Sequence, residues 1–269
     1  MPEEFSQFLG PEVELIDPIQ FSEWILEEED GVLAINKPGL IVCHPSKNGP
    51  WSSLIGAARE YLQMDLVHLV HRLDRETSGV CVLAKDKYHA RILQMAFQLK
   101  QVCKEYVALL EGELSEVVEL DNFLAKDLDS KVYIKQTVRK SHSAKRAHTL
   151  FSPIMTGSGY TLAKIVPETG RKHQIRVHAA FLGHPLVGDK LYGPDEGHYL
   201  EFIEKGYTPA QEKALGFHRH ALHAFRILFD PPQFSRTFKA PLHRDMVQLI
   251  VAKLGCTEAD LVKLRILGK

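Results

Sequence analysis

The stretch HRLDRETSG at residues 71–79 places two cations and two acids between two apolar runs, at 66–70 and 80–84. The run that begins at Gly79 predicts a short strand, so the charged segment is expected to be a loop at the end of a sheet. Such loops present side chains into a cleft on a rigid scaffold. The closing Thr-Ser-Gly suits a tight, hydrogen-bonded turn that fixes the loop.

Asp74 is the candidate catalytic group of this loop. Arg72 and Arg75 flank it, and a nearby cation favours the charged form of a carboxyl group, so Asp74 is expected to be ionised. The residues alone leave two alternatives, a loop of surface salt bridges and a hydrolase that combines Asp74 with Ser78 or a histidine. The hydrolase would need a base placed against Ser78, and no triad spacing indicates one.

The segment GRKHQIRVH at residues 170–178 is a second concentration of positive charge. It is expected to lead into a helix over 173–182 that Gly183 closes. Cations in the first turns oppose the helix dipole, so a negative group should compensate them. That group is phosphate or Asp74, and a basic, exposed helix face is the alternative.

The remaining patterns predict strands and helices that do not alternate strictly. Helices are expected at 52–62, after caps at Asp86, Thr208 and Thr257, and from about 244. A pair of strands is expected at 32–36 and 40–42. Further strands are expected at 106–110, 131–138, 160–166 and 221–229. This order favours an α+β fold with a largely antiparallel central sheet and flanking helices over a doubly wound parallel sheet.

The composition is that of a soluble globular protein, with 45% hydrophobic and 25% charged residues. No apolar run approaches the roughly 18 residues of a membrane span, and the start of the chain lacks the order of a secretory signal. A cytoplasmic location with no membrane partner is therefore expected. The cysteines form no Cys-x-x-Cys pair and are interpreted as buried small hydrophobic residues: Cys43, Cys81, Cys103 and Cys256.

The net charge of −1 averages two unlike regions. Residues 1–30 contain ten acidic side chains and no Lys or Arg, so subtracting −10 leaves residues 31–269 at +9. Two explanations stay open for the basic residues of 126–148, a phosphate-binding face or ordinary surface lysines. They are Lys126, Lys131, Lys135, Arg139, Lys140, Lys145 and Arg146.

Motifs for several other chemistries are absent, namely the phosphate-binding loop, the dinucleotide-binding glycine motif, the zinc-protease helix motif and the nucleophile elbow of hydrolases. His218, His220 and His223 are close in sequence, but no acidic or thiol ligand accompanies them at useful spacing. A structural or RNA-facing role is favoured over metal binding.

Taken in order, these motifs resemble those of the RluA-type pseudouridine synthases. The stretch 71–79 matches the HRLD-x-x-TSG signature at every fixed position, and 170–178 is similar to the GR-x-HQIR-x-H segment. Four shorter matches lie between about residues 24 and 250, namely Lys37-Pro38-Gly39, Lys104-Glu105-Tyr106, the GD-x-x-YG of 188–193 and the R-x-x-LHA of 219–224. Leu40 departs from the pattern, because a small residue often takes its position.

The resemblance implies the pseudouridine synthase catalytic fold and the isomerisation of uridine to pseudouridine in RNA. It implies that Asp74 is the catalytic carboxylate, that Arg176 pairs with it and that Tyr106 stacks on the base. Arg72 would fill the gap left by the flipped base, and Leu73 would line the uracil pocket. Further RNA contacts are assigned to Arg75, Arg171, Lys172 and His173. No metal or other cofactor is needed.

The resemblance also bears on domains and partners. Residues 1–20 are expected to form an acidic lead-in and 21–269 one catalytic domain, without the S4 domain that often precedes it. The partner is expected to be rRNA or tRNA and not DNA, bound by a monomer, and no role is assigned to the 194–218 insertion. An RNA-remodelling module that keeps the fold without catalysis is the alternative, and Asp74→Asn distinguishes the two.

Overall fold

The computed structural model describes residues 15–29, 31–44 and 49–266. These residues divide into two compact units. The N-terminal unit contains residues 15–106, 223–248 and 256–266, and the central unit contains residues 107–222 and 249–255. Strand β5 (Val102–Glu111) passes from one unit into the other. Each unit is described by itself.

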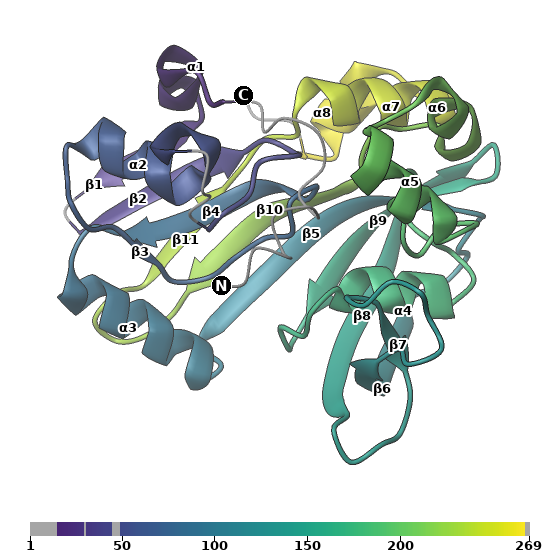
Figure 1. The fold of residues 1–269 in the computed structure, drawn as a ribbon, viewed down its shortest axis with the longest axis horizontal. Coiled ribbons are helices and arrows are strands. Elements are labelled where there is room, and N and C mark those ends of the chain that lie inside the picture. Colours follow the sequence, from purple (N-terminus) through teal and green to yellow (C-terminus); the bar gives the residue numbers. More distant parts are fainter. Residues whose placement is uncertain (1–14, 30, 45–48, 267–269) are drawn as a thin grey trace. The chain divides into compact units, whose positions relative to one another are not determined.

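The sheet of the N-terminal unit has the strand order β1-β2-β4-β10. Strand β2 (Val32–Lys37) pairs antiparallel with β1 (Ile25–Glu29) and with β4 (Ser78–Ala84). A short parallel pairing joins β4 to β10 (Leu222–Phe229), while β3 (His68–Leu69) and β11 (Arg236–Lys239) pair antiparallel with β4 and β10. Every residue of β2 and β4 is buried, so the core of this unit lies around these two strands (Figure 1).

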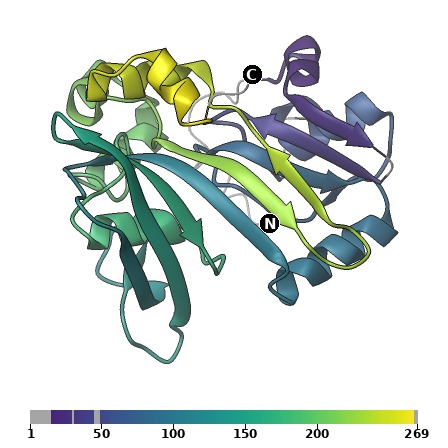
Figure 2. The same ribbon diagram turned by 180° about the vertical axis from the view of Figure 1, so that it is seen from behind.

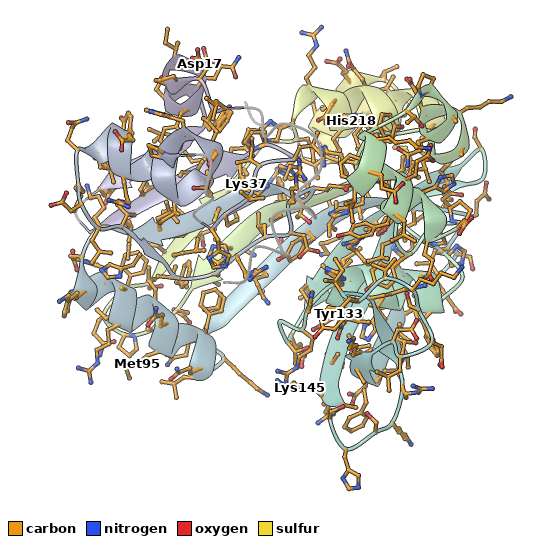
Figure 3. The ribbon with its side chains drawn as sticks, in the orientation of Figure 1. Asp17, Lys37, Met95, Tyr133, Lys145 and His218 are labelled. Carbon is orange, nitrogen blue, oxygen red and sulfur yellow. The ribbon has the colours of Figure 1, made fainter. Side chains whose placement is uncertain are left out.

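Local hydrogen bonds at their first turns explain where the helices of this unit begin. Asp17 caps α1 (Pro18–Glu23), at the place labelled in Figure 3, and Ser53 caps α2 (Leu54–Leu62), which follows a 3-10 turn at Pro50–Ser52. Asp86 accepts a hydrogen bond from the His89 amide and caps α3 (Lys87–Gln98), as predicted. Helix α8 (Glu258–Lys263) begins at the capping box of Thr257, and α7 (Arg244–Leu254) precedes it.

The central unit contains the antiparallel strand order β9-β8-β6-β7. These strands are β6 (Val118–Lys126), β7 (Gln136–Val138), β8 (Lys145–Gly157) and β9 (Tyr160–Pro167). Helix α4 (Gln174–Phe181) packs against β7, β8 and β9, and Figure 2 shows the strands from the side opposite to this helix. Helices α5 (Gly197–Lys205) and α6 (Pro209–Leu215) form most of the 194–218 segment.

The predicted α+β class, with a mixed and largely antiparallel sheet and flanking helices, is confirmed. Two predicted strands are wrong in part. Residues 40–42 form no strand, because Leu40 has a φ of 69° in a turn and β2 pairs with β1 and β4 instead. Only 136–138 of the predicted 131–138 strand forms, because the preceding residues fold into a turn.

Two further features differ from or add to the sequence analysis. Cys43 and Cys81 are buried as predicted, but Cys103 is exposed and Cys256 is partly exposed, so the interpretation of all four as core residues is wrong. Among the helices of the described ranges, none has both the length and the apolar character that a membrane crossing requires. The acidic residues 1–14 lie outside the described residues.

Replacing Gly79 by alanine is expected to destabilise the N-terminal unit. The φ of Gly79 is +110°, and an added Cβ would lie 2.3 Å from the carbonyl oxygen of Ala224, its partner region in β10. The backbone conformation alone costs a non-glycine residue about 1–3 kcal/mol, and the collision adds to that cost. Urea unfolding should show a lower midpoint for G79A.

Gly157→Ala is the matched control, because the nearest atom to its added Cβ is 3.9 Å away. This variant should unfold close to the wild type. Equal midpoints for G79A and G157A would contradict the requirement for glycine at position 79.

Candidate active site

The predicted loop at 71–79 leads from β3 into β4 and is fixed by a buried lysine. Lys37, at the end of β2 and labelled in Figure 3, is fully buried. Its Nζ donates hydrogen bonds to the carbonyl oxygens of Pro38 at 2.8 Å, Ile41 at 2.9 Å and Arg75 at 3.1 Å. Carbonyl oxygens thus solvate a buried charge, and in return the ammonium group ties the 38–41 turn to the loop that carries Asp74.

The loop is closed by its own backbone and by a contact with the backbone of the neighbouring turn. The Thr77 amide donates to the Asp74 carbonyl at 3.1 Å, so the tight turn lies at 74–77, earlier than predicted, and Ser78 and Gly79 already belong to β4. Leu73 is buried at 6% exposure. Arg75 Nε donates to the Leu40 carbonyl at 3.2 Å, so Arg75 has a structural contact in addition to the RNA contact predicted for it.

Arg72 lies beside a histidine that accepts from it. Arg72 Nη1 is 3.1 Å from His44 Nε2. Partial burial, together with the Arg72 cation, lowers the pKa of His44. The neutral ring can accept a hydrogen bond, so His44 orients the Arg72 guanidinium and does not repel its positive charge.

Tyr106 experiences the negative charge of Asp74. The phenol is in the last part of β5 that belongs to the N-terminal unit and packs against the apolar core there. Burial, and then the negative charge of Asp74, raise the pKa of Tyr106 above its ordinary range. Tyr106 is therefore a neutral phenol that experiences the charge of the candidate catalytic carboxylate, and its stacking on the base stays a prediction.

His71 starts the loop and connects it to β4. Its Nε2 accepts a hydrogen bond from the Val82 amide at 2.9 Å, and its ring packs against Phe97 of α3 with centroids 5.5 Å apart. Desolvation and the charge of Lys104 lower the pKa of His71 to about 3. Burial also lowers the pKa of Lys104, to about 8. His71 is thus a neutral structural acceptor at physiological pH.

Arg176, the other predicted catalytic residue, belongs to α4 in the central unit. Its Nε and Nη2 donate to the two carboxylate oxygens of Asp189, both at 2.7 Å, and Asp189 is fully buried. The amides of Leu191 and Tyr192 also donate to Asp189, at 2.9 and 3.0 Å. Burial alone would raise the pKa of Asp189, but the Arg176 cation and these hydrogen bonds hold it well below its usual range.

Asp189 is therefore a charged partner of Arg176, a contact that the sequence analysis did not predict. It supplies negative charge beside the basic segment, where phosphate or Asp74 was expected to do so. The GD-x-x-YG motif was the available signal, since it placed an acid at a fixed distance after the helix. The predicted pairing of Arg176 with Asp74 joins residues of the two units and stays a prediction.

The three predicted RNA-binding residues before α4 differ in their surroundings. Arg171 and Lys172 are exposed, and Arg171 Nε donates to the Arg146 carbonyl at 3.0 Å. His173 is buried with a φ of 55°, and its Nδ1 lies 2.9 Å from the hydroxyl of Tyr192. A left-handed conformation at a non-glycine residue is strained and is held by such contacts.

The histidine that lies against Ser78 is His223, but the pair does not form a hydrolytic site. Ser78 Oγ is 2.9 Å from His223 Nδ1, and His223 Nε2 is 3.0 Å from the Ala240 carbonyl. The carbonyl fixes the proton on Nε2, so Nδ1 accepts from the serine. Both side chains are fully buried, so a substrate carbonyl cannot reach this serine, and the pair joins β4 to β10.

Comparisons with known proteins agree with this geometry. The family model described as RNA pseudouridylate synthase matches residues 31–181, more than half of the chain. The chain belongs to this family. The match includes the loop of Asp74, Tyr106 and all of α4, so the predicted resemblance is confirmed and the chain is an RNA pseudouridine synthase.

Individual relatives of this synthase support the same assignment. It is 32% identical over 239 residues to ribosomal large subunit pseudouridine synthase D of Haemophilus ducreyi, a match that covers 85% of this chain and 70% of that one. It is 36% identical to ribosomal large subunit pseudouridine synthase C of Pasteurella multocida, with coverages of 87% and 68%. The solved human RNA pseudouridylate synthase domain containing 4 superposes with a TM-score of 0.67 at 26% identity, covering 87% of this chain and 94% of that one.

The stability of the synthase should decrease as the pH is lowered, because of His71. Between about pH 6.5 and pH 3 the unfolded chain binds a proton at this ring that the folded chain does not, so stability is lost as the pH falls through this window. His71→Gln should make the urea midpoint less sensitive to a change from pH 7 to pH 5. The exposed His142 provides the control, since His142→Gln should retain the wild-type dependence.

Asp189→Asn should destabilise the synthase strongly, because it removes the buried negative charge that Arg176 contacts at two points. Removing one member of a buried ion pair costs about 3–5 kcal/mol. The control is Asp121→Asn, whose ion pair with Arg146 is exposed and should contribute little. Denaturant unfolding of both variants tests the difference, and similar midpoints would show that the buried pair is not needed for folding.

Proposed function

We propose that this synthase isomerises uridine in RNA with Asp74 as the catalytic carboxylate. The observation that carries the proposal is that Asp74 lies in a loop fixed by the buried Lys37 amine, with Tyr106 within range of its charge. Pseudouridine formation breaks the bond from the ribose anomeric carbon to the uracil nitrogen and rejoins the base through a ring carbon. An ionised oxygen beside a sugar of oxocarbenium character supports this cleavage, either as nucleophile or as base toward a ribose proton.

Arg176 is proposed to hold the carboxylate of Asp74 charged and aimed at the sugar. A guanidinium is planar and can present one edge to each of two acids. In the central unit, Asp189 accepts from Nε and Nη2 and so fixes the plane of the group. Asp189 would therefore act as a positioning residue for Arg176, without contact to the substrate.

Tyr106 is proposed to stack on the uracil ring. Its raised pKa keeps the phenol neutral, which favours stacking and hydrogen-bond donation over removal of a proton by a phenolate. If Tyr106 takes the final proton from the ring carbon, its own proton must pass to a neighbouring base, and the Asp74 carboxylate is the group whose charge it experiences.

The uridine must leave the base stack before this chemistry can occur, and Arg72 is proposed to occupy the gap. Its guanidinium can stack on neighbouring bases, and the contact with His44 orients it for insertion. Leu73 would line the uracil pocket. Arg75, Arg171, Lys172 and His173 are proposed to contact RNA around it.

The target is proposed to be large-subunit ribosomal RNA, with tRNA as the second candidate. Two relatives that each match more than four fifths of the chain are named for the large ribosomal subunit. We further propose that residues 21–269 act as one catalytic domain, in a monomer in the cytoplasm. RNA is favoured over DNA because the reaction centre is a uridine ribose, whose 2′-hydroxyl distinguishes the two.

Asp74→Asn should abolish pseudouridine formation and leave RNA binding intact, because an amide cannot attack the sugar or accept its proton. The expected loss of rate is about a thousand-fold or more. Total RNA from cells lacking the gene, complemented with either wild type or D74N, is mapped for pseudouridine. Asp65→Asn, an exposed acid shortly before the loop, is the control and should restore every site.

Two outcomes would contradict the proposal. If D74N restores the missing pseudouridines, Asp74 is not the catalytic group. If the wild-type protein changes no site in the cell and releases no tritium from uracil-labelled transcripts, the chain does not act as a synthase on these RNAs.

A further inference from the structure

The turn that replaces the predicted strand at 131–135 is held in place by one carboxylate. Glu196, at the start of α5, accepts hydrogen bonds from Ser130 Oγ at 2.7 Å, the Lys131 amide at 3.1 Å and Lys135 Nζ at 2.7 Å. The hydrogen bonds from Lys135 and Ser130 lower the pKa of Glu196, so the carboxylate remains charged at physiological pH. Val132 is buried at 3% exposure and adds an apolar contact to the core of the central unit.

The same turn leaves an aromatic side chain in solvent. This side chain is Tyr133, which is labelled in Figure 3. It is 73% exposed, although both of its neighbours in sequence are at least partly buried. The Nζ of Lys126 lies 3.3 Å from the centroid of its ring. A cation over one face restricts the ring to one orientation. Folding buries Val132 and fixes the turn, but it gains little from Tyr133 itself.

Besides Lys126, the sequence around this ring is rich in positive charge. The segment 126–148 contains seven basic residues and two acids, Asp127 and Asp129. Three exposed lysines belong to it, namely Lys131, Lys140 and Lys145. A polyanion is therefore attracted to this part of the central unit, and an exposed aromatic ring among lysines is the combination that binds single-stranded nucleic acid by stacking and charge.

We propose that Tyr133 stacks on an unpaired base of the substrate RNA, on a surface formed by Tyr133, Lys126 and Lys131 and held by Glu196. This surface is here called the stacking surface. The inference rests on the proposed function only in taking RNA as the substrate. It gives the 194–218 insertion a role, because Glu196 belongs to that segment and fixes the turn before RNA binds.

Preorganisation explains why the turn is tied down at three points. A flexible loop would lose conformational freedom on binding and so weaken the affinity. A ring already fixed by Glu196 and Lys126 avoids most of that loss. Stacking of one base on an aromatic side chain corresponds to a change of about 5- to 100-fold in affinity on substitution by alanine.

Steady-state kinetics on RNA extracted from cells lacking the gene provide the first test. Tyr133→Ala should raise KM about 5-fold or more and leave kcat unchanged, because the ring contributes to binding but not to the reaction. Tyr133→Phe should retain the wild-type KM, since stacking needs the ring and not the hydroxyl. Glu196→Gln should raise KM by a smaller factor, because it loosens the turn and keeps the ring.

Tyr88→Ala is the matched control, because Tyr88 is an exposed tyrosine of α3 at 65% exposure. It should behave as the wild type. If Y133A and Y88A have the same KM while the wild-type protein is active, the stacking surface is refuted and the proposed function stands. If the wild-type protein forms no pseudouridine, the proposed function fails, and the binding measurement below still decides the inference.

A fluorescence measurement detects the stacking directly. The D74N protein carrying Tyr133→Trp is titrated with single-stranded oligouridylate, and base stacking should quench the added indole. The D74N protein carrying Tyr88→Trp reports the background from Trp24 and Trp51. Equal quenching in the two proteins would overturn the inference, and greater quenching at position 133 supports it.

Discussion

The buried ammonium group of Lys37 is the interaction on which the geometry of the N-terminal unit's candidate site depends. It joins carbonyl oxygens of the 38–41 turn to that of Arg75, so two segments distant in sequence meet at one charge. Removing a lysine from water is costly unless strong acceptors replace the water. The hydrogen bonds that stabilise the charge therefore also fix the position of the loop that carries Asp74.

In the central unit, a second buried cation is also stabilised by hydrogen bonds that fix its position. Arg176 and Asp189 satisfy each other in a planar, two-bonded contact, and backbone amides complete the hydrogen bonds of the carboxylate. Such a pair contributes orientation more than stability, because desolvation offsets much of its attraction. A guanidinium whose plane is fixed is suited to aiming another carboxylate, which is the role proposed for it.

Three titratable side chains in and around the N-terminal unit's candidate site are uncharged. His71 and His44 have lowered pKa values and Tyr106 has a raised one, so all three are neutral at physiological pH. Neutral neighbours can accept, donate or stack without competing with Asp74 for charge. The stacking surface at Tyr133 has a different proposed role, because its ring and lysines are proposed to bind RNA and to take no part in the reaction.

Features that depend on short-range contacts could be predicted from the residues alone. The caps at Asp86, Thr208 and Thr257 form as predicted because each hydrogen bond spans three residues. The signature of 71–79 likewise identified the family. Only the tertiary structure decided that residues 40–42 and 131–135 would not be strands, that Asp189 would bind Arg176 and that Glu196 would hold the turn of Tyr133. Each of these features depends on a partner that is distant in sequence, and local periodicity does not show which distant residue makes the contact.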